Sequence, residues 1–248
     1  MYPEILHLYG PFSIHSYGLM IALGVITFVW TANRHPLRKK YMSSDALMDL
    51  VIMGTFWAVA GGRLLYVLTQ WHTLDNWSDL FNVWQGGLSL LGSVLACGIF
   101  APLYLWRHHI PVLPCLDLIG INAPLLQSIS RIGCFLAGCC YGRAFHSGWL
   151  DAHPTQLYSA ALLLMIFFTL RWVYNTKNMH QGQFFALYLI MSNAERFCVD
   201  FFRGDQEFYS HSLLGAISIH QWIALTLLCL GLIGFGMARR TTRYGRPL

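Results

Sequence analysis

The chain has 248 residues, of which 56% are apolar and only 11% are charged. With a mean hydropathy of +0.48, this composition excludes a water-soluble globular protein and indicates an integral membrane protein. The net charge of +5 comes from basic residues that follow connecting loops instead of forming a patch, so nucleic acid is not an expected partner.

Seven apolar stretches are long enough, or nearly long enough, to cross a bilayer. They cover residues 12–32, 46–69, 88–106, 116–136, 156–172, 183–199 and 214–238. The sequence therefore predicts an all-α integral membrane protein with seven transmembrane helices. It contains no evident repeat, linker or low-complexity tract, which predicts a single polytopic domain over residues 1–248.

The segments between these stretches alternate in charge. Residues 34–40, 107–109, 171–177 and 239–246 are basic, whereas residues 75–79 and 205–207 are acidic. Basic loops stay in the cytoplasm, so we expect the N-terminus outside and the C-terminus in the cytoplasm. The first sixteen residues lack Lys and Arg, so no cleavable signal peptide is expected.

The fourth stretch is the weakest predicted span. Asn122 and Pro124 interrupt it, and Ser128, Ser130 and Arg131 follow closely. We expect a broken or re-entrant helix here. Irregular backbone at membrane depth needs surrounding protein or a water-filled cavity, so this element should face the middle of the bundle.

Of the 16 Lys and Arg residues, the five outside the basic segments lie inside these stretches or at their outer ends, and all five are arginines: Arg63, Arg131, Arg143, Arg196 and Arg203. A guanidinium group holds phosphate through two parallel hydrogen bonds, which makes a lipid phosphate a natural ligand. Arg63 and Arg203 could instead pair with carboxylates or reach headgroups from a helix end. Each intramembrane arginine costs roughly 2.5–3.5 kcal/mol on insertion scales, and no acidic residue separates Arg131 from Arg143, so we interpret this pair as functional.

A second polar segment, ERFCVDFFRGD from Glu195 to Asp205, ends the sixth stretch. Its spacings of four and three residues allow Asp200 to meet both Arg196 and Arg203. A paired network is expected because the burial of either charge alone is costly.

The segment SRIGCFLAGCCYGR, from Ser130 to Arg143, resembles the signature of the prolipoprotein diacylglyceryl transferases, bacterial enzymes that lipidate lipoprotein precursors. Six further segments are similar to the family in order and spacing: Ser16–Met20, Gly61–Leu68, Gln85–Ser93, HPTQLY from His153 to Tyr158, ERFCVDFFRGD and Ser218–Gln221. The resemblance covers nearly the whole chain. The family is also known for seven spans with a periplasmic N-terminus.

The resemblance implies a multi-pass transferase of the bacterial inner membrane. It would transfer the diacylglyceryl group of phosphatidylglycerol, a membrane lipid, to the lipobox cysteine thiol of a prolipoprotein signal peptide, and release glycerol phosphate. Arg131 and Arg196 would contact the phosphate, and Tyr17 would line the headgroup pocket. Substrate binding would also involve Arg63, Arg143, Asp200 and Arg203, with Arg143 supporting the loop. No cofactor is expected.

The chain departs from the family pattern at several polar positions. Leu91 stands where the family has a histidine, and Cys134 and Cys139 stand where it has an asparagine and a glutamate. Leu91 cannot accept a proton, so another base is needed for the acceptor thiol. His153 is one substitute, although a histidine before Pro154 can also simply cap the next helix.

The cysteines allow three further interpretations. Cys139 or Cys140 could be a nucleophile with its pKa lowered by a nearby arginine, which would make the transfer a two-step reaction. A disulfide from Cys134 to Cys139 or Cys140 fits the oxidising side of the membrane. The Cys-x4-Cys-Cys spacing is not typical of zinc sites, so a metal site completed by His146 or His153 is not expected.

Two other functions remain open, and Leu91 favours both. One is a divergent paralogue that keeps the phospholipid pocket but uses another acceptor or thiol-based chemistry. The other is a non-catalytic membrane protein whose arginines only bind a phospholipid headgroup.

Overall fold

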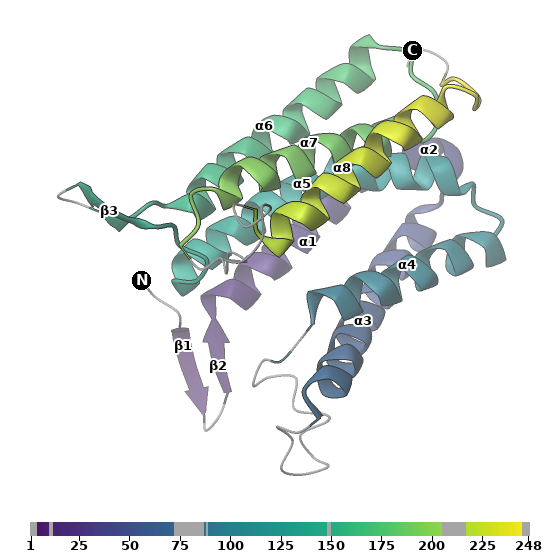
Figure 1. Ribbon diagram of the computed structural model, residues 1–248. Coiled ribbons are helices and arrows are strands. Elements are labelled where there is room, and N and C mark those ends of the chain that lie inside the picture. The colour runs from purple at the N-terminus through teal and green to yellow at the C-terminus, as the bar shows by residue number, and fades with distance from the viewer. Residues whose placement is uncertain are drawn as a thin grey trace. The chain divides into compact units, whose positions relative to one another are not determined.

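The computed structural model describes residues 4–9, 12–71, 87, 89–147, 150–204 and 217–244 (Figure 1). Its helices are α1 (Ser16–Arg34), α2 (Pro36–Tyr41), α3 (Ser44–Thr69), α4 (Leu90–Arg107), α5 (Val112–Ala137), α6 (Thr155–Thr176), α7 (Gln183–Asp200) and α8 (Ile219–Ala238). Two antiparallel hairpins pair β1 (Glu4–Tyr9) with β2 (Phe12–His15), and β3 (Ala144–Ser147) with β4 (Leu150–Ala152).

The prediction of a helical membrane protein is confirmed, with short hairpins that the sequence analysis did not anticipate. Each of the seven predicted stretches contains one long helix, although the first opens as strand β2. In the described part of the chain, α1, α3, α5, α6 and α8 are long and apolar enough to cross a membrane, and α4 is a shorter apolar helix. The acidic segments at 75–79 and 205–207 lie outside the described residues.

The expectation of a broken fourth helix is wrong, because α5 continues over 26 residues with Pro124 inside it. Its polar side chains bond to nearby carbonyls instead of interrupting the helix. Asn122 Nδ2 donates to the carbonyl of Leu118 at 2.7 Å, and Ser128 Oγ donates to that of Ala160 in α6 at 2.8 Å. A membrane helix tolerates proline when neighbouring groups satisfy its backbone, and α5 is the most buried of the five candidate spans.

The described residues form two compact units, residues 1–35 with 116–248 and residues 36–115. In the first, α7 packs against both α6 and α8, as Figure 1 shows. In the second, α3 packs on α4 at Gly61 and Gly92, whose backbones meet so closely that a Cβ on Gly61 would lie 2.7 Å from the Gly92 carbonyl oxygen. The single domain stays a prediction.

Asp117 in α5 fixes the start of α7. Its fully buried carboxylate accepts hydrogen bonds from the backbone N–H groups of Gly182 at 2.6 Å and Phe185 at 2.8 Å, and from the Tyr244 hydroxyl at 2.7 Å. These N–H groups belong to the first turn of α7, where they lack partners within the helix. The carboxylate thereby caps α7 and anchors the helix that carries the polar segment at its other end.

Candidate functional site

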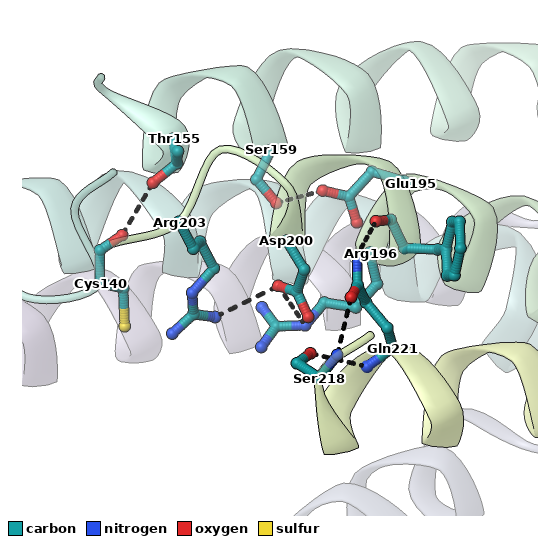
Figure 2. Close-up of polar contacts among 10 residues, drawn as sticks. Cys140, Thr155, Ser159, Glu195, Arg196, Asp200, Arg203, Ser218 and Gln221 are labelled. Carbon is teal, nitrogen blue, oxygen red and sulfur yellow. Dashed lines mark hydrogen bonds and ion pairs between the residues drawn. The ribbon is translucent and has the colours of Figure 1, made fainter. Parts of the chain in front are cut away.

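Asp200, at the end of α7, lies between two arginines. Its side chain is fully buried, and its Oδ1 atom lies 3.3 Å from Nε of Arg196 and 3.7 Å from Nη1 of Arg203. Figure 2 shows both guanidinium groups reaching toward this carboxylate. The predicted pairing is confirmed. Neither carboxylate oxygen receives a hydrogen bond from the described residues, so Asp200 meets both arginines through ionic contacts alone.

Arg131, near the end of α5, adds a third guanidinium to this group. It interacts electrostatically with Glu195, Arg196 and Asp200, but it makes no hydrogen bond or ion pair with any described residue. Glu195 is buried and accepts a hydrogen bond from the Ser159 hydroxyl of α6. Three guanidinium groups therefore accompany two carboxylates. When all five side chains are ionised, their net charge is +1.

Tyr17, in the first turn of α1, lies at the same end of α5. Its hydroxyl interacts electrostatically with Cys134 and Arg131, and Ser130 lies beside it. Gly133 permits this approach of the two helices, because a Cβ at that position would lie 2.9 Å from the Cβ of Met20. Tyr17 is 41% exposed and so remains accessible to a ligand.

A Schellman motif ends α5 and brings two cysteines together. Gly138 has φ = +75°, its N–H donates to the Phe135 carbonyl at 3.2 Å, and the Cys139 N–H donates to the Cys134 carbonyl at 3.1 Å. This motif places Cys134, in the last turn of the helix, beside Cys139, the second residue after the helix cap. The Sγ atoms of Cys134, Cys139 and Cys140 all lie within 4.8 Å of one another, and no disulfide joins them.

The loop between α5 and β3, residues 138–143, is called here the cysteine loop. Side chains in the first turn of α6 donate hydrogen bonds to the carbonyl oxygens of this loop. Thr155 Oγ1 donates to the Cys140 carbonyl at 2.9 Å, which Figure 2 shows, and Gln156 Nε2 donates to the Cys139 carbonyl at 2.7 Å. Both side chains are buried. Cys140 itself adopts φ = +60°, a left-handed conformation that non-glycine residues rarely hold unless their surroundings impose it.

The loop is also joined to the end of α7. The Gly142 N–H donates to the His153 carbonyl at 2.9 Å, and the Arg143 N–H donates to the Phe202 carbonyl at 2.9 Å. A Cβ on Gly142 would lie 2.6 Å from both the His153 Cβ and the Phe202 carbonyl oxygen. Only glycine therefore lets these three segments meet, and the cysteine loop is fixed against the segment that carries Arg203.

The surroundings of the Cys140 thiol favour its deprotonated form. A hydrogen bond from Cys134 and the positive charges of Arg203 and Arg131 lower the pKa of Cys140 below its ordinary value, against the effect of burial. Burial and the neighbouring Cys140 raise the pKa of Cys139. Two thiols and two arginines thus surround the Cys140 thiol at this end of α5.

The model of the prolipoprotein diacylglyceryl transferase family matches residues 3–237 of this chain. The chain belongs to that family. Among its relatives is the phosphatidylglycerol–prolipoprotein diacylglyceryl transferase of Clostridium tetani, which is 30% identical over 96% of this chain and 98% of its own. The enzyme of the same name from Methylobacillus flagellatus is 31% identical over 92% and 93% of the two chains. That from Bordetella bronchiseptica is 30% identical over 90% of each.

This member of the transferase family is a multi-pass membrane protein, as its apolar helices and its relatives indicate. Six of the residues singled out from the sequence lie in one group at one end of the first unit: Tyr17, Arg131, Cys139, Arg196, Asp200 and Arg203. Their roles toward a substrate stay predictions.

The other candidates lie elsewhere. His153 sits beside Tyr158 and Phe202, with its Nδ1 atom 3.5 Å from the Tyr158 hydroxyl and its backbone bonded to the cysteine loop. Arg143 is exposed and joins the loop to α7 through its backbone. Arg63 belongs to the second unit, where Nη1 donates to the Gly87 carbonyl at 3.0 Å and the guanidinium lies over the Tyr66 ring.

The residues that position this group were not among the predicted site residues. They lie on a buried face at the start of α6. Thr155 and Gln156 donate hydrogen bonds to the cysteine loop, and Ser159 donates one to Glu195. Small polar residues at the start of an apolar helix look like ordinary capping residues in a sequence. Only the fold shows that their side chains bond to other segments of the chain and not to the start of their own helix.

Proposed function

We propose that this protein transfers the diacylglyceryl group of phosphatidylglycerol to the lipobox cysteine thiol of a prolipoprotein signal peptide. The observation that supports this most strongly is the cationic group of Arg131, Arg196 and Arg203, built around the buried Asp200 and next to a thiol-rich loop. The names of its relatives agree with this activity.

The cationic group suits a phosphate that becomes a leaving group. Transfer breaks the bond between the glycerol carbon and the phosphate oxygen, so negative charge develops on the departing glycerol phosphate. Fixed guanidinium groups stabilise such charge best when they are already in place and shielded from water. Arg131 has no hydrogen bond or ion pair with a described residue, so its fork is available to the phosphate.

Direct transfer is better supported than a two-step route through Cys139 or Cys140. An enzyme cysteine that attacked the lipid would form a thioether, and a thiolate is displaced from such a carbon only with difficulty. The lipid would then stay on the enzyme. We therefore assign the loop cysteines a role other than that of a nucleophile that carries the diacylglyceryl group.

The helix directions support seven spans with a periplasmic N-terminus. Tyr17 at the start of α1, Arg131 near the end of α5, Thr155 at the start of α6 and Asp200 at the end of α7 all contribute to one group. Successive spans that alternate in direction produce this meeting of starts and ends. The charge pattern of the loops puts that end of the helices at the periplasmic face.

The transfer reaction tests this function. The purified protein is incubated with phosphatidylglycerol vesicles and a lipobox peptide, and the peptide mass is measured. We expect a peptide heavier by one diacylglyceryl group and an equal amount of glycerol phosphate. A folded protein that binds the lipid but leaves the peptide mass unchanged would contradict the proposal.

A different thiol acceptor is the second candidate. Leu91 and the cysteines at positions 134 and 139 change polar positions of the family pattern without removing the arginines. The same assay with a short thiol in place of the peptide separates the two. Release of glycerol phosphate with the short thiol but not with the lipobox peptide would favour this candidate.

A further inference from the structure

Three thiols gather in the last turns of α5 and on the loop after it, and none of them carries the diacylglyceryl group in direct transfer. The Sγ atoms of Cys134, Cys139 and Cys140 lie within 4.8 Å of one another, and the Cys139 thiol donates to the Cys134 carbonyl at 3.6 Å. In the part of the chain that the structure describes, no fourth histidine, cysteine or carboxylate joins this group. The side chain of His146 lies outside that part.

The backbone holds the three sulfurs in place. The Schellman motif at Gly138 sets Cys134 beside Cys139, and the left-handed conformation of Cys140 turns its side chain back toward both. Thr155 and Gln156 then fix the two loop carbonyls. The spacing that is untypical of zinc sites in a sequence therefore becomes a compact three-sulfur group once the helix end is known.

The size of the group fits a tetrahedral thiophilic metal ion. With zinc–sulfur bonds of about 2.3 Å, two thiolate ligands are about 3.8 Å apart, so the sulfurs need to move inward by at most about 1 Å. A disulfide requires the sulfurs to approach to about 2.05 Å and would leave the third thiol unpaired. The metal thus uses all three cysteines with the smaller displacement.

The surrounding charge also favours thiolates. Arg203 and Arg131 interact electrostatically with Cys140, and Arg131 interacts with Cys134 as well. Figure 2 shows the Cys140 thiol pointing in the same direction as the Arg203 guanidinium. A divalent ion with three thiolates has a net charge of −1, which these arginines offset.

We propose that Cys134, Cys139 and Cys140 bind a zinc ion through three thiolates and leave its fourth position open for the thiol of the acceptor. Zinc sites that bind a substrate keep such a position open, whereas structural sites are closed by four protein ligands. The metal site does not depend on the proposed function, whereas the role of its open position does.

The open position would do the work of the missing base. A thiol that binds zinc loses its proton, which passes to solvent. The acceptor sulfur then attacks the glycerol carbon, a C–S bond forms, and the C–O bond to the phosphate breaks with its electron pair on glycerol phosphate. No oxidant or reductant takes part. Leu91 is then compatible with activity, because proton removal no longer needs a histidine at that position.

Cobalt titration of the full chain tests the metal site. The protein is purified anaerobically, stripped with a chelator and titrated with Co²⁺, and the thiolate-to-cobalt charge-transfer band is recorded. We expect saturation at one ion per chain and displacement by Zn²⁺. Changes in the surroundings of metal ligands cost about 10–100-fold in affinity, so C134S, C139S or C140S should weaken binding by at least about 100-fold. C198S and C229S, which replace exposed cysteines on α7 and α8, should leave it unchanged.

Two results would overturn the metal site. One is the lack of a charge-transfer band while mass spectrometry after alkylation shows all three thiols reduced. The other is a band that persists in C134S, C139S and C140S. Because the wild-type titration needs no substitution, misfolding of a variant cannot decide the outcome.

Activity separates the metal site from the proposed function. Stoichiometric zinc without transfer to the lipobox peptide would contradict the proposed function and leave the metal site intact. Transfer that continues in the chelator-treated protein and in C140S would support the function and overturn the role of the open position. We expect transfer to stop on chelation and to return with added Zn²⁺.

Discussion

Arg131 differs from the other two arginines of the group because no described carboxylate pairs with it. Replacement by lysine keeps the charge but removes the planar fork that holds two phosphate oxygens. Loss of one charge-assisted hydrogen bond costs about 1.5–3 kcal/mol, so R131K should lower kcat/KM for transfer by about 10–150-fold. R107K, at the exposed end of α4, should transfer at the wild-type rate. Equal rates for the two variants would contradict the phosphate role of Arg131.

Asp200 is the buried counter-charge of two arginines. Its replacement by asparagine raises the excess positive charge of the group from one to two, and removal of one partner of a buried ion pair typically costs about 3–5 kcal/mol. Arg196 is 24% exposed, so D200N should lie near the lower end of that range. Chemical unfolding of D200N in detergent measures the loss. D45N, in the exposed first turn of α3, serves as the matched control.

His35 gives the protein a predictable response to acid. It is buried beneath Tyr174, and burial, followed by the charge of Arg171, lowers its pKa to about 4 in the folded protein. The unfolded chain has a pKa of about 6.5 for this group and binds the proton first, so stability is complete above about pH 6.5 and falls toward pH 4. The loss amounts to roughly 3 kcal/mol at most.

Unfolding temperatures of wild type and H35N between pH 7 and pH 4 measure this response. The wild type should lose stability across this window, and H35N should lose less of it. H109N, at an exposed loop position, should behave like the wild type. Identical pH profiles for wild type and H35N would show that His35 does not carry the effect.

At the level of elements, the site depends on how tightly three segments meet. The loop after α5, the start of α6 and the end of α7 converge at Gly142. G142A introduces a Cβ at 2.6 Å from two neighbours, and such overpacking typically costs about 1–3 kcal/mol. G98A, at a position with nothing within 4 Å, should cost nothing. Circular dichroism should show unchanged helix content in G142A together with a lower unfolding temperature. The peptide-mass assay should show reduced transfer.

The elements also show what sequence alone could predict. Hydropathy located every long helix, and the spacing of Arg196, Asp200 and Arg203 correctly predicted their pairing, because both depend on local periodicity. Pro124 misled the prediction of α5, since its effect depends on partners that other helices supply. Cys134 and Cys139 come together through the cap at Gly138, a geometry that the spacing implies only when the helix end is placed correctly.

At the level of the whole molecule, the charge pattern predicts seven spans with a periplasmic N-terminus and a cytoplasmic C-terminus. Reporter fusions test this orientation. Alkaline phosphatase, which is active only outside the cytoplasm, should be inactive at the C-terminus and active when fused after Gln70, at the end of α3. A fluorescent protein should show the opposite pattern. Phosphatase activity at the C-terminus would require an even number of spans or the reverse orientation.

The proposed function depends on a cationic group at one end of the helices that holds the phosphate of a membrane lipid. The most direct measurement is a density map of the protein in nanodiscs that contain phosphatidylglycerol. The proposed function predicts a lipid phosphate within hydrogen-bonding distance of Arg131 and Arg196, beside the thiols of Cys134, Cys139 and Cys140. A map in which carboxylates bind all three guanidinium groups, with every lipid phosphate outside hydrogen-bonding distance of them, would contradict it.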